Sequence, residues 1–149
     1  MTGPGDGIGE NADALGDRLT IPRQPSYGHS RTVLLCDDRQ ELRSAISTVL
    51  AGFRRFRVIG EAIDAATCLR AVEDIRPDIL ILDVSLPGGG PPVARAVRNL
   101  HPAIHILVYS GRTDPRVQRD MLAAGADQYL VKTGRMAPLI AALDRAAGR

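Results

Sequence analysis

The sequence predicts an α/β fold in which five strand–helix units surround one parallel sheet. Short apolar runs alternate with amphipathic stretches from residue 31 to the end of the chain. One run, Ile79–Leu82, consists only of large aliphatic residues and leads into the Pro/Gly-rich turn 87–92. Such a run is typical of a strand buried on both faces of a parallel sheet. Right-handed crossovers between successive strands then put helices on both faces and give a three-layer sandwich.

The composition is that of one ordinary globular domain. The chain has 149 residues, 44% of them apolar and 24% charged, which leaves room for one domain and a tail. Aromatic residues make up only 3%, so the predicted core is aliphatic. The net charge of +2 neither requires nor excludes an acidic partner, and no concentrated basic footprint for nucleic acid is present. We interpret the basic cluster 54–57 as a solvated loop at the start of a strand.

Cysteine usage and hydropathy indicate where the protein works. Cys36 and Cys68 are far apart in the sequence and have no C-x-x-C pattern or nearby histidine. We therefore expect buried thiols in a reducing cytoplasm rather than a disulfide or a metal site. No apolar run approaches membrane-spanning length, and the N-terminus lacks a signal pattern. The sequence thus predicts a cytoplasmic protein without a membrane partner.

The first 30 residues differ from those that follow. Residues 1–30 are rich in glycine and proline and carry few large apolar side chains. Such a segment cannot bury enough surface to offset the entropy lost on ordering. We expect a flexible N-terminal extension in front of a domain of residues 31–149, with one or two helical turns possible at residues 10–19.

The first part of the domain predicts two strands and two helices. Thr32–Cys36 is an apolar strand, and the amphipathic helix after it ends at Gly52 and buries Leu42, Ile46, Val49 and Leu50. Phe56–Ala62 alternates only in part, as an edge strand does. Asp64 can cap a second helix that stops before Pro77, with an apolar face of Leu69, Val72 and Ile75.

The third and fourth strands follow the same pattern. Ile79–Leu82 ends at Asp83, and either Pro91 or Pro92 suits the first position of the helix that follows the glycine turn. That helix is expected to bury Val93, Val97 and Leu100. His105–Ser110 is a second continuous apolar run and therefore a second central strand.

The last part of the domain adds two helices and one strand. The pair Asp114 and Pro115 starts a helix that Gly125 ends, with Val117, Met121 and Ala124 facing inward. Gln128–Val131 is the fifth strand, and the final helix carries Met136, Leu139, Ile140 and Leu143. Five such units most simply adopt the flavodoxin-like strand order 2-1-3-4-5.

Polar residues follow the carboxyl ends of four of these strands. Two carboxylates, Asp37 and Asp38, follow the first strand, and Asp83 follows the third. Ser110 ends the fourth strand, and Lys132 follows the fifth. In the order 2-1-3-4-5 the first and third strands flank the topological switch point, where open α/β sheets bind ligands. We therefore expect a site of three carboxylates, a hydroxyl and an ammonium group.

These residue types suit phosphoryl chemistry at a magnesium site. Three neighbouring carboxylates repel one another unless a cation neutralises them. A hard ion with oxygen ligands such as Mg²⁺ fits, whereas the lack of histidine and cysteine argues against zinc or copper. A carboxylate can also act as a nucleophile and form an aspartyl phosphate. Lys132 and Ser110 could then hold phosphoryl oxygens, and positioning of this kind supplies most of the catalysis.

Several motifs at these positions resemble those of response-regulator receiver domains. They are the pair Asp37-Asp38, Asp83 with Leu86-Pro87 after it, Ser110-Gly111, and Tyr129-x-x-Lys132. The resemblance covers roughly residues 31–147. It is similar to the NarL/FixJ type at 76–78 (Arg-Pro-Asp) and at 124–130 (Ala-Gly-Ala-Asp-Gln-Tyr-Leu). Each motif alone is weak, but together, at the ends of the correct strands, they are strong.

The resemblance implies a role for each site residue. Asp83 would accept phosphate from a phosphohistidine, and Lys132 would pair with the phosphoryl group. Asp83 would also belong to the metal site. There Asp38 would bind Mg²⁺ directly, Asp37 would act largely through metal-bound water, and the backbone carbonyl of Ser85 would complete the protein's share of the metal shell. Two further sets of roles are implied: switching by Ser110 and Tyr129, and tuning of the phosphate lifetime by Ser85 and Arg112.

The resemblance also implies partners. A sensor histidine kinase or a histidine phosphotransfer protein would dock on the first helix, around Arg39, Leu42, Arg43 and Ile46. Output to a downstream protein would use the face of the fourth helix, fifth strand and fifth helix, and phosphorylation could drive homodimerisation there. The chain would be no enzyme beyond its own magnesium-dependent phosphorylation and dephosphorylation, and it would contact no nucleic acid directly.

Two departures from the family pattern stand out. Receivers usually have an apolar residue and then Asp-Gly after the proline, whereas this chain has Gly88-Gly89-Gly90-Pro91-Pro92. We expect this loop to be more mobile than usual, because glycine adds conformational freedom. Lys132 is followed by Thr133 rather than the frequent proline, a variation that the NarL/FixJ type tolerates.

Other readings remain open at this stage. The chain could be a stand-alone receiver, a fragment of a NarL-type transcription factor without its DNA-binding domain, or a pseudo-receiver that is never phosphorylated. A haloacid-dehalogenase-like phosphatase is disfavoured, because it needs Asp-x-Asp after the first strand and residues 36–39 do not supply it. A flavodoxin is disfavoured too, since no phosphate-binding loop follows that strand.

Overall fold

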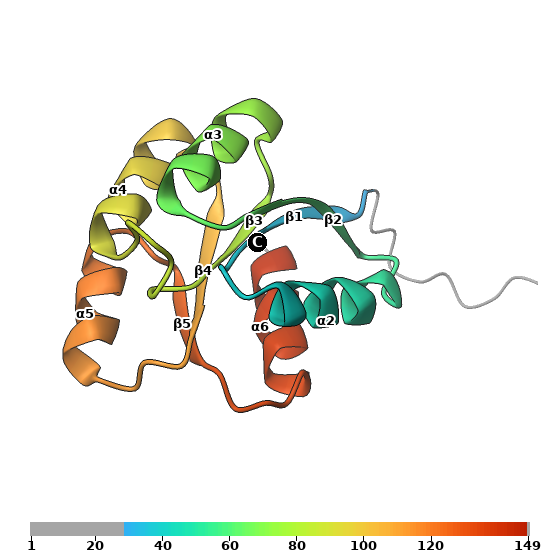
Figure 1. Cartoon of the computed structure of the whole chain (residues 1–149). Helices are drawn as coiled ribbons and strands as arrows, with labels where there is room; N and C mark the ends of the chain where they lie inside the picture. Colours follow the sequence, from blue (N-terminus) through green and yellow to red (C-terminus); the bar gives the residue numbers. More distant parts are fainter. Residues whose placement is uncertain (1–28, 149) are drawn as a thin grey trace, which may run out of the picture.

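The computed structural model describes residues 29–148 (Figure 1). The extension predicted for residues 1–30 falls almost wholly on residues outside this range. Within it, strands and helices alternate throughout: β1 (Arg31–Cys36), α2 (Gln40–Ala51), β2 (Phe56–Ala62), α3 (Ala65–Ile75), β3 (Ile79–Leu82), α4 (Pro91–Leu100), β4 (His105–Ser110), α5 (Pro115–Ala123), β5 (Gln128–Val131) and α6 (Ala137–Ala147). No helix in the described range is long and apolar enough to cross a membrane.

The five strands form one parallel sheet in the order β2-β1-β3-β4-β5. This confirms the predicted fold class and strand order. β2 lies at one edge, as its partial alternation predicted, and its register with β1 shifts between Val33 and Leu34. β3 and β4 lie in the interior of the sheet, and all their residues are buried. Their continuous apolar runs therefore reflect burial on both faces.

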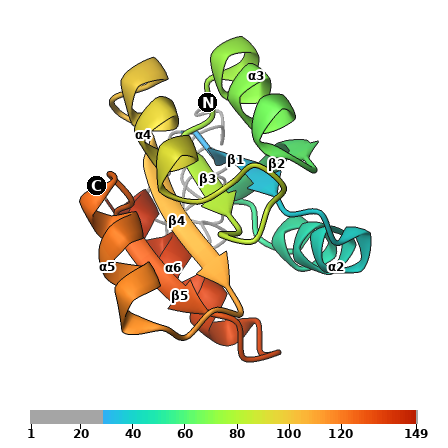
Figure 2. The same cartoon turned by 60° about the vertical axis from the view of Figure 1, so that its left-hand side comes forward.

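Two apolar cores hold the three layers together. On one face, α3, α4 and α5 pack on the sheet through Cys68, Val72, Ala94, Val97 and Met121. On the other face, α2 and α6 pack through Ile46, Leu50, Leu139, Ala142 and Leu143. Figure 2 shows the sheet between these two groups of helices. Alternate residues of β1, β3 and β4 point to opposite cores, as the period of a strand requires.

Local signals account for the helix boundaries. The Asp64 side chain accepts a hydrogen bond from the Thr67 backbone N–H at 2.8 Å and so caps α3, as predicted. Asp114 caps α5 in a similar way, accepting from the Arg116 N–H at 2.8 Å. Pro91 opens α4, where its missing N–H costs no hydrogen bond.

Three details of the predicted helix faces were wrong. Ile75, predicted on the apolar face of its helix, is 38% exposed, and Leu100, predicted to be buried, is 36% exposed. Each is the final residue of its helix, where the sheet covers less of the side chain, and Cys68 and Ala94 are buried instead. Met136 precedes α6 as its N-cap residue rather than lying within the helix. It still packs, partly buried, against the α2/α6 core.

A polar cluster joins α4, β4 and β5 at the amino ends of the strands. Asp127 accepts hydrogen bonds from the Ile106 backbone N–H and from Arg98, both at 2.8 Å. Arg98 also donates to the carbonyl oxygens of Ile104 and Gly125, each at 2.6 Å. Buried His105 lies beside Asp127, with Nδ1 and Oδ2 3.9 Å apart. His105 thus packs within this structural cluster, away from the carboxyl edge of the sheet.

Candidate functional site

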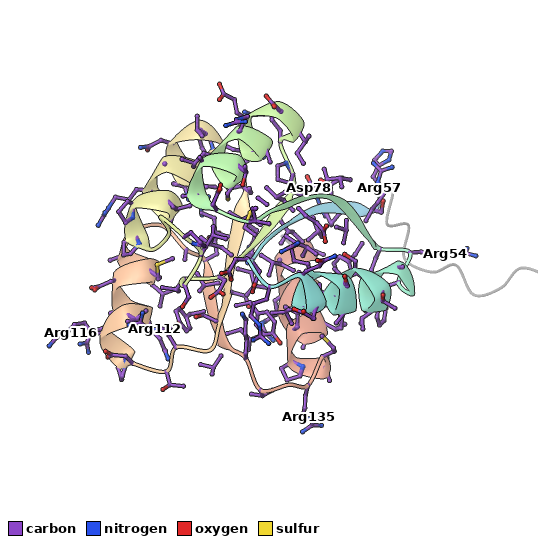
Figure 3. All side chains as sticks on the ribbon, viewed as in Figure 1. Arg54, Arg57, Asp78, Arg112, Arg116 and Arg135 are labelled. Carbon is purple, nitrogen blue, oxygen red and sulfur yellow. The ribbon has the colours of Figure 1, made fainter. Side chains whose placement is uncertain are left out.

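The predicted site residues meet at the carboxyl edge of the sheet. Asp37 follows β1, Asp83 follows β3, Ser110 ends β4 and Lys132 follows β5. Asp37 and Asp83 are 6% and 5% exposed, and Ser110 is fully buried. In Figure 3, Arg112 and Arg135, which follow β4 and β5, lie at this end of the molecule, and Asp78, which precedes β3, lies at the other. The strand order therefore brings together groups that are up to 95 residues apart in the sequence.

Three carboxylates form a compact acidic cluster at this edge. One oxygen from each of Asp37, Asp38 and Asp83 lies within 4.8 Å of the other two. Asp38 is exposed, so the cluster opens to solvent, while the other two carboxylates form its floor. An oxygen-only donor set that is open on one side fits Mg²⁺, which keeps several of its waters. The residues present therefore suit the ion that the sequence predicted.

Lys132 bridges the two buried carboxylates. Its Nζ lies 2.8 Å from Asp37 Oδ2 and 3.2 Å from Asp83 Oδ2. The ammonium group offsets part of the repulsion between the two carboxylates.

Backbone groups orient the carboxylates. Asp37 Oδ1 accepts the Arg39 N–H at 2.8 Å, and Asp83 Oδ1 accepts the Ser85 N–H at 3.1 Å. The Asp83 N–H in turn donates to the Cys36 carbonyl at 3.0 Å, which ties the ends of β3 and β1 together. These hydrogen bonds leave Asp83 Oδ2 on the side of Lys132.

Ser110, Arg112 and Tyr129 form a hydrogen-bonded set next to the cluster. Ser110 Oγ accepts the Arg112 N–H at 3.2 Å, and the Tyr129 hydroxyl donates to the Arg112 carbonyl at 2.7 Å. Partial burial raises the pKa of Tyr129, so the phenol stays protonated and remains a donor. Ser110 and Tyr129 are thus linked through the backbone of Arg112.

The sequence did not indicate the structural role of two residues near the site, Arg43 and Tyr109. Arg43, expected only on the docking surface of the first helix, donates to the Asp37 carbonyl at 2.6 Å and so fixes α2 to the end of β1. Tyr109 lies under Lys132, whose Nζ is 5.8 Å from the ring centroid, and burial raises its pKa. The inward alternation of β4 could have indicated Tyr109, but only the tertiary structure pairs Arg43 with Asp37.

The glycine-rich loop after β3 contacts the start of α3. Leu86, at 2% exposure, anchors the loop in the α3/α4/α5 core. Gly89 donates to the Leu86 carbonyl at 2.7 Å, and the Pro87 carbonyl accepts from the Ala65 N–H at 2.9 Å. Gly90 adopts φ +94, which only glycine adopts readily. The greater mobility expected of this loop stays a prediction.

The two cysteines lie in one core. Cys36 and Cys68 are both buried and free, as the sequence predicted. Burial, together with the neighbouring Cys68 thiol, raises the pKa of Cys36 well above its ordinary range. The thiol is accordingly inert at neutral pH.

Comparison with known proteins finds one family. The sequence profile of the response regulator receiver domain matches residues 33–144. The chain is 29% identical over 112 residues to the response regulator GacA of Pseudomonas viridiflava. The match covers 74% of this chain and 52% of GacA. It is 33% identical over 119 residues to the DNA-binding transcriptional activator DevR/DosR of Mycobacterium tuberculosis, covering 78% of this chain and 55% of that protein. The chain thus spans about half the length of the curated relatives it matches.

Solved structures give the same result. The signal receiver domain of the putative response regulator NarL from Mycobacterium tuberculosis superposes with a TM-score of 0.74 at 31% sequence identity. The match covers 81% of this chain and 99% of that domain. A two-component response regulator of the LuxR family from Aurantimonas superposes with a TM-score of 0.75 at 29% identity, covering 80% of this chain and 87% of the other.

Proposed function

This chain belongs to the response regulator receiver domain family of two-component systems, and we propose that Asp83 is its phosphoacceptor. The single observation that carries this proposal is the environment of the Asp83 carboxylate. It is almost fully buried at a strand end, oxygen atoms of two further carboxylates lie within 4.8 Å, and Lys132 Nζ is 3.2 Å from Oδ2. A carboxylate beside a metal site and an ammonium group is suited to in-line attack on phosphorus.

The proposed step transfers one phosphoryl group. A carboxylate oxygen of Asp83 attacks the phosphorus of a phosphohistidine, a P–O bond forms, and the P–N bond breaks with its electron pair returning to the imidazole nitrogen. Asp38, Asp83 and the Ser85 carbonyl would hold Mg²⁺, with Asp37 acting largely through metal-bound water, and the ion would neutralise charge on the phosphoryl oxygens when it is bound. Lys132 would pair with another phosphoryl oxygen, so its contact with Asp83 would become a contact with the product.

Phosphorylation would be read out through Ser110 and Tyr129. Ser110 would move toward the phosphoryl group, and this movement would break or stretch its hydrogen bond with the Arg112 N–H. Tyr129, which donates to the Arg112 carbonyl, would follow and change the α5–β5–α6 face. Exposed Ser85 and Arg112 flank the site, and there they would control how quickly water reaches the phosphoryl group.

Partners follow from the same proposal. A sensor histidine kinase or histidine phosphotransfer protein would dock beside the site on α2, around Arg39, Leu42, Arg43 and Ile46. The α5–β5–α6 face would bind a downstream protein or a second phosphorylated copy. Since the matched relatives are about twice as long, the interpretation as part of a longer transcription factor stays open. A cytoplasmic location is part of this proposal.

Intact-protein mass spectrometry tests the phosphoacceptor role. The chain would be incubated with Mg²⁺ and acetyl phosphate, beside Asp83→Asn and the matched control Asp120→Asn, whose side chain is exposed on α5. We expect a gain of one phosphoryl group that is lost in Asp83→Asn and with chelator but kept in Asp120→Asn.

A beryllofluoride titration covers the case in which only the cognate kinase, and not acetyl phosphate, can donate a phosphoryl group to this chain. Magnesium-dependent binding of beryllofluoride that Asp83→Asn abolishes would support the proposal without a phosphodonor. Failure of both modification and beryllofluoride binding would overturn it and favour the pseudo-receiver, a reading to which the unusual 88–92 loop lends some weight.

A further inference from the structure

A surface groove lies between the C-terminal end of α2 and the start of the edge strand β2. Its volume is about 450 Å³, and its lining residues are Ser47, Ala51, Phe53, Arg54, Phe56, Arg57 and Val58. Phe56 is buried, while Phe53 and Val58 are half-buried, so the floor of the groove is apolar. The groove is near the amino ends of the strands and is separate from the acidic cluster at their carboxyl ends.

The rim of this groove is positively charged. Arg54 and Arg57 are exposed, and Figure 3 shows both directed outward at the right of the molecule. Neither side chain has a hydrogen bond or ion pair with another residue of the described range 29–148. Arg55 differs, because it stacks over the Phe53 ring at 4.6 Å and pairs with Asp144 at 2.6 Å. No acidic residue lines the groove, so its positive rim is uncompensated there.

The chain enters the fold next to this groove. Arg31, the first residue of β1, is in register with Phe56, and its backbone N–H donates to the Arg55 carbonyl at 2.8 Å. The residues before β1 therefore start beside the groove. Residues 20–28 could span up to about 30 Å, which is enough for residues 10–19 to reach any part of it.

The sequence of residues 10–19 complements the groove. It contains Glu10, Asp13 and Asp17 against the single basic residue Arg18, and its large apolar side chains are Leu15 and Leu19. We propose that this segment docks in the groove of its own chain, with its leucines on the apolar floor and its carboxylates beside Arg54 and Arg57. The short tether favours this occupant, because it raises the local concentration of the segment into the millimolar range.

Docking would account for two surface features that the receiver function leaves unexplained, the apolar floor and the positive rim of the groove. It would cover the half-buried Phe53 and Val58 and neutralise the rim arginines. It would also place the N-terminal segment at the end of α2 that lies away from the proposed kinase surface. The inference does not depend on phosphorylation of Asp83, so each can fail without the other.

Paramagnetic relaxation in the full-length chain tests the docking. A nitroxide would be attached at Ala12→Cys, where it can be directed because Cys36 and Cys68 are buried. We expect selective loss of amide signal intensity at residues 53–58. Arg54→Glu with Arg57→Glu should abolish this loss, and adding Asp13→Arg with Asp17→Arg should restore it. Arg116→Glu with Arg119→Glu, an equal charge change on the exposed face of α5, is the matched control and should leave the loss in place.

Three results would overturn the proposal. The first is a loss of amide signal intensity that is absent or spread evenly over the surface of the domain. The second is broadening at residues 53–58 that persists unchanged after both rim arginines are reversed. The third is broadening in a mixture of isotope-labelled chains and separate spin-labelled chains, which would assign the groove to a second copy. Unchanged amide dispersion in each variant would show that the fold is intact.

Discussion

At the level of single residues, the site depends on a balance between repulsion and pairing. Asp37, Asp38 and Asp83 crowd three negative charges together, and Lys132 offsets only the two buried ones. Arrangements of this kind reduce stability in exchange for a function, because like charges at short range oppose the folded state. Each carboxylate can therefore be tested by its effect on stability as well as by its effect on phosphorylation.

Asp38→Asn should stabilise the metal-free protein. Removing the exposed charge relieves repulsion across 4.8 Å or less, which at a water-like dielectric is worth about 0.5–1 kcal/mol. The same change should remove most of the stabilisation that Mg²⁺ gives the wild type. Urea unfolding with and without MgCl₂ measures both effects, with Asp120→Asn as control. An unaltered response to Mg²⁺ in Asp38→Asn would contradict its place as a metal ligand.

Asp127 provides a pH-dependent contribution to stability. Burial by itself raises the pKa of this carboxyl group, but the Ile106 N–H and the Arg98 guanidinium outweigh burial and hold the pKa below its usual range. A lowered pKa gives stability that is present above the unfolded-state pKa, about 3.9, and is lost as pH falls through the folded-state value.

Asp127→Asn should therefore cost stability mainly above pH 4. We expect a loss of about 1–2 kcal/mol at pH 7, since a partly exposed charged hydrogen-bond pair is weakened. The difference from wild type should shrink as the pH is lowered from 5 to 3. Denaturant unfolding across this range measures it. A deficit that stays constant with pH would mean that the carboxylate charge plays no part.

At the level of elements, the connection between β3 and α4 combines a buried anchor with a demanding backbone position. Leu86 anchors it in the core, and Gly90 takes an unusual backbone conformation, φ +94 and ψ −162, immediately before α4. Residues other than glycine rarely adopt that conformation. The triple glycine that departs from the family pattern thus contains at least one position with a conformational requirement.

Gly90→Ala should destabilise the domain through its backbone alone. An added Cβ would meet no atom closer than 3.9 Å, so crowding is small. The backbone strain should cost about 1–3 kcal/mol. Gly111→Ala is the matched control, because its Cβ would meet nothing within 4 Å and its φ is not positive. Thermal unfolding compares the two, and equal melting temperatures would show that the loop adapts without strain.

At the level of the whole molecule, one sheet carries the site at its carboxyl edge and lies between two separate helix layers. α2 and α6 pack on one face and α3, α4 and α5 on the other. The path through Ser110, Arg112 and Tyr129 leads to α5 and β5. The strand β2 lies at the opposite edge of the sheet from β5, and its contact with the site is the backbone hydrogen bond from the Asp37 N–H to the Ala62 carbonyl at 3.1 Å.

Beryllofluoride with Mg²⁺ should therefore change hydrogen exchange unevenly. We expect altered protection at residues 110–116 and 128–132, with little change in β2 and the C-terminal half of α3. Tyr129→Phe, which removes the hydroxyl hydrogen bond to Arg112, should reduce the change on the α5 side without preventing beryllofluoride binding. Exchange measured by mass spectrometry tests both. A response confined to the binding site would argue against the switch.

The sequence by itself determined the fold class, the strand order and the bounds of most elements. It did so because alternating apolar runs, the Asp64 cap and the glycine and proline stops are local signals, and because parallel strands need crossover helices. It also identified which polar residues follow the strands. Once the strands pair in parallel, those residues must meet at one edge.

Only the tertiary structure decided what depends on contacts between distant segments. Arg43 reaches Asp37, Lys132 bridges two carboxylates, Arg98 and Asp127 join α4 to β5, and Tyr109 lies beneath the lysine. The exposure of Ile75 and Leu100 also depended on how far the sheet extends beside each helix end. The local sequence pattern indicates which face of a helix or strand is apolar. The contact partner of each side chain, the distance between them and the exposed fraction are set by packing between elements.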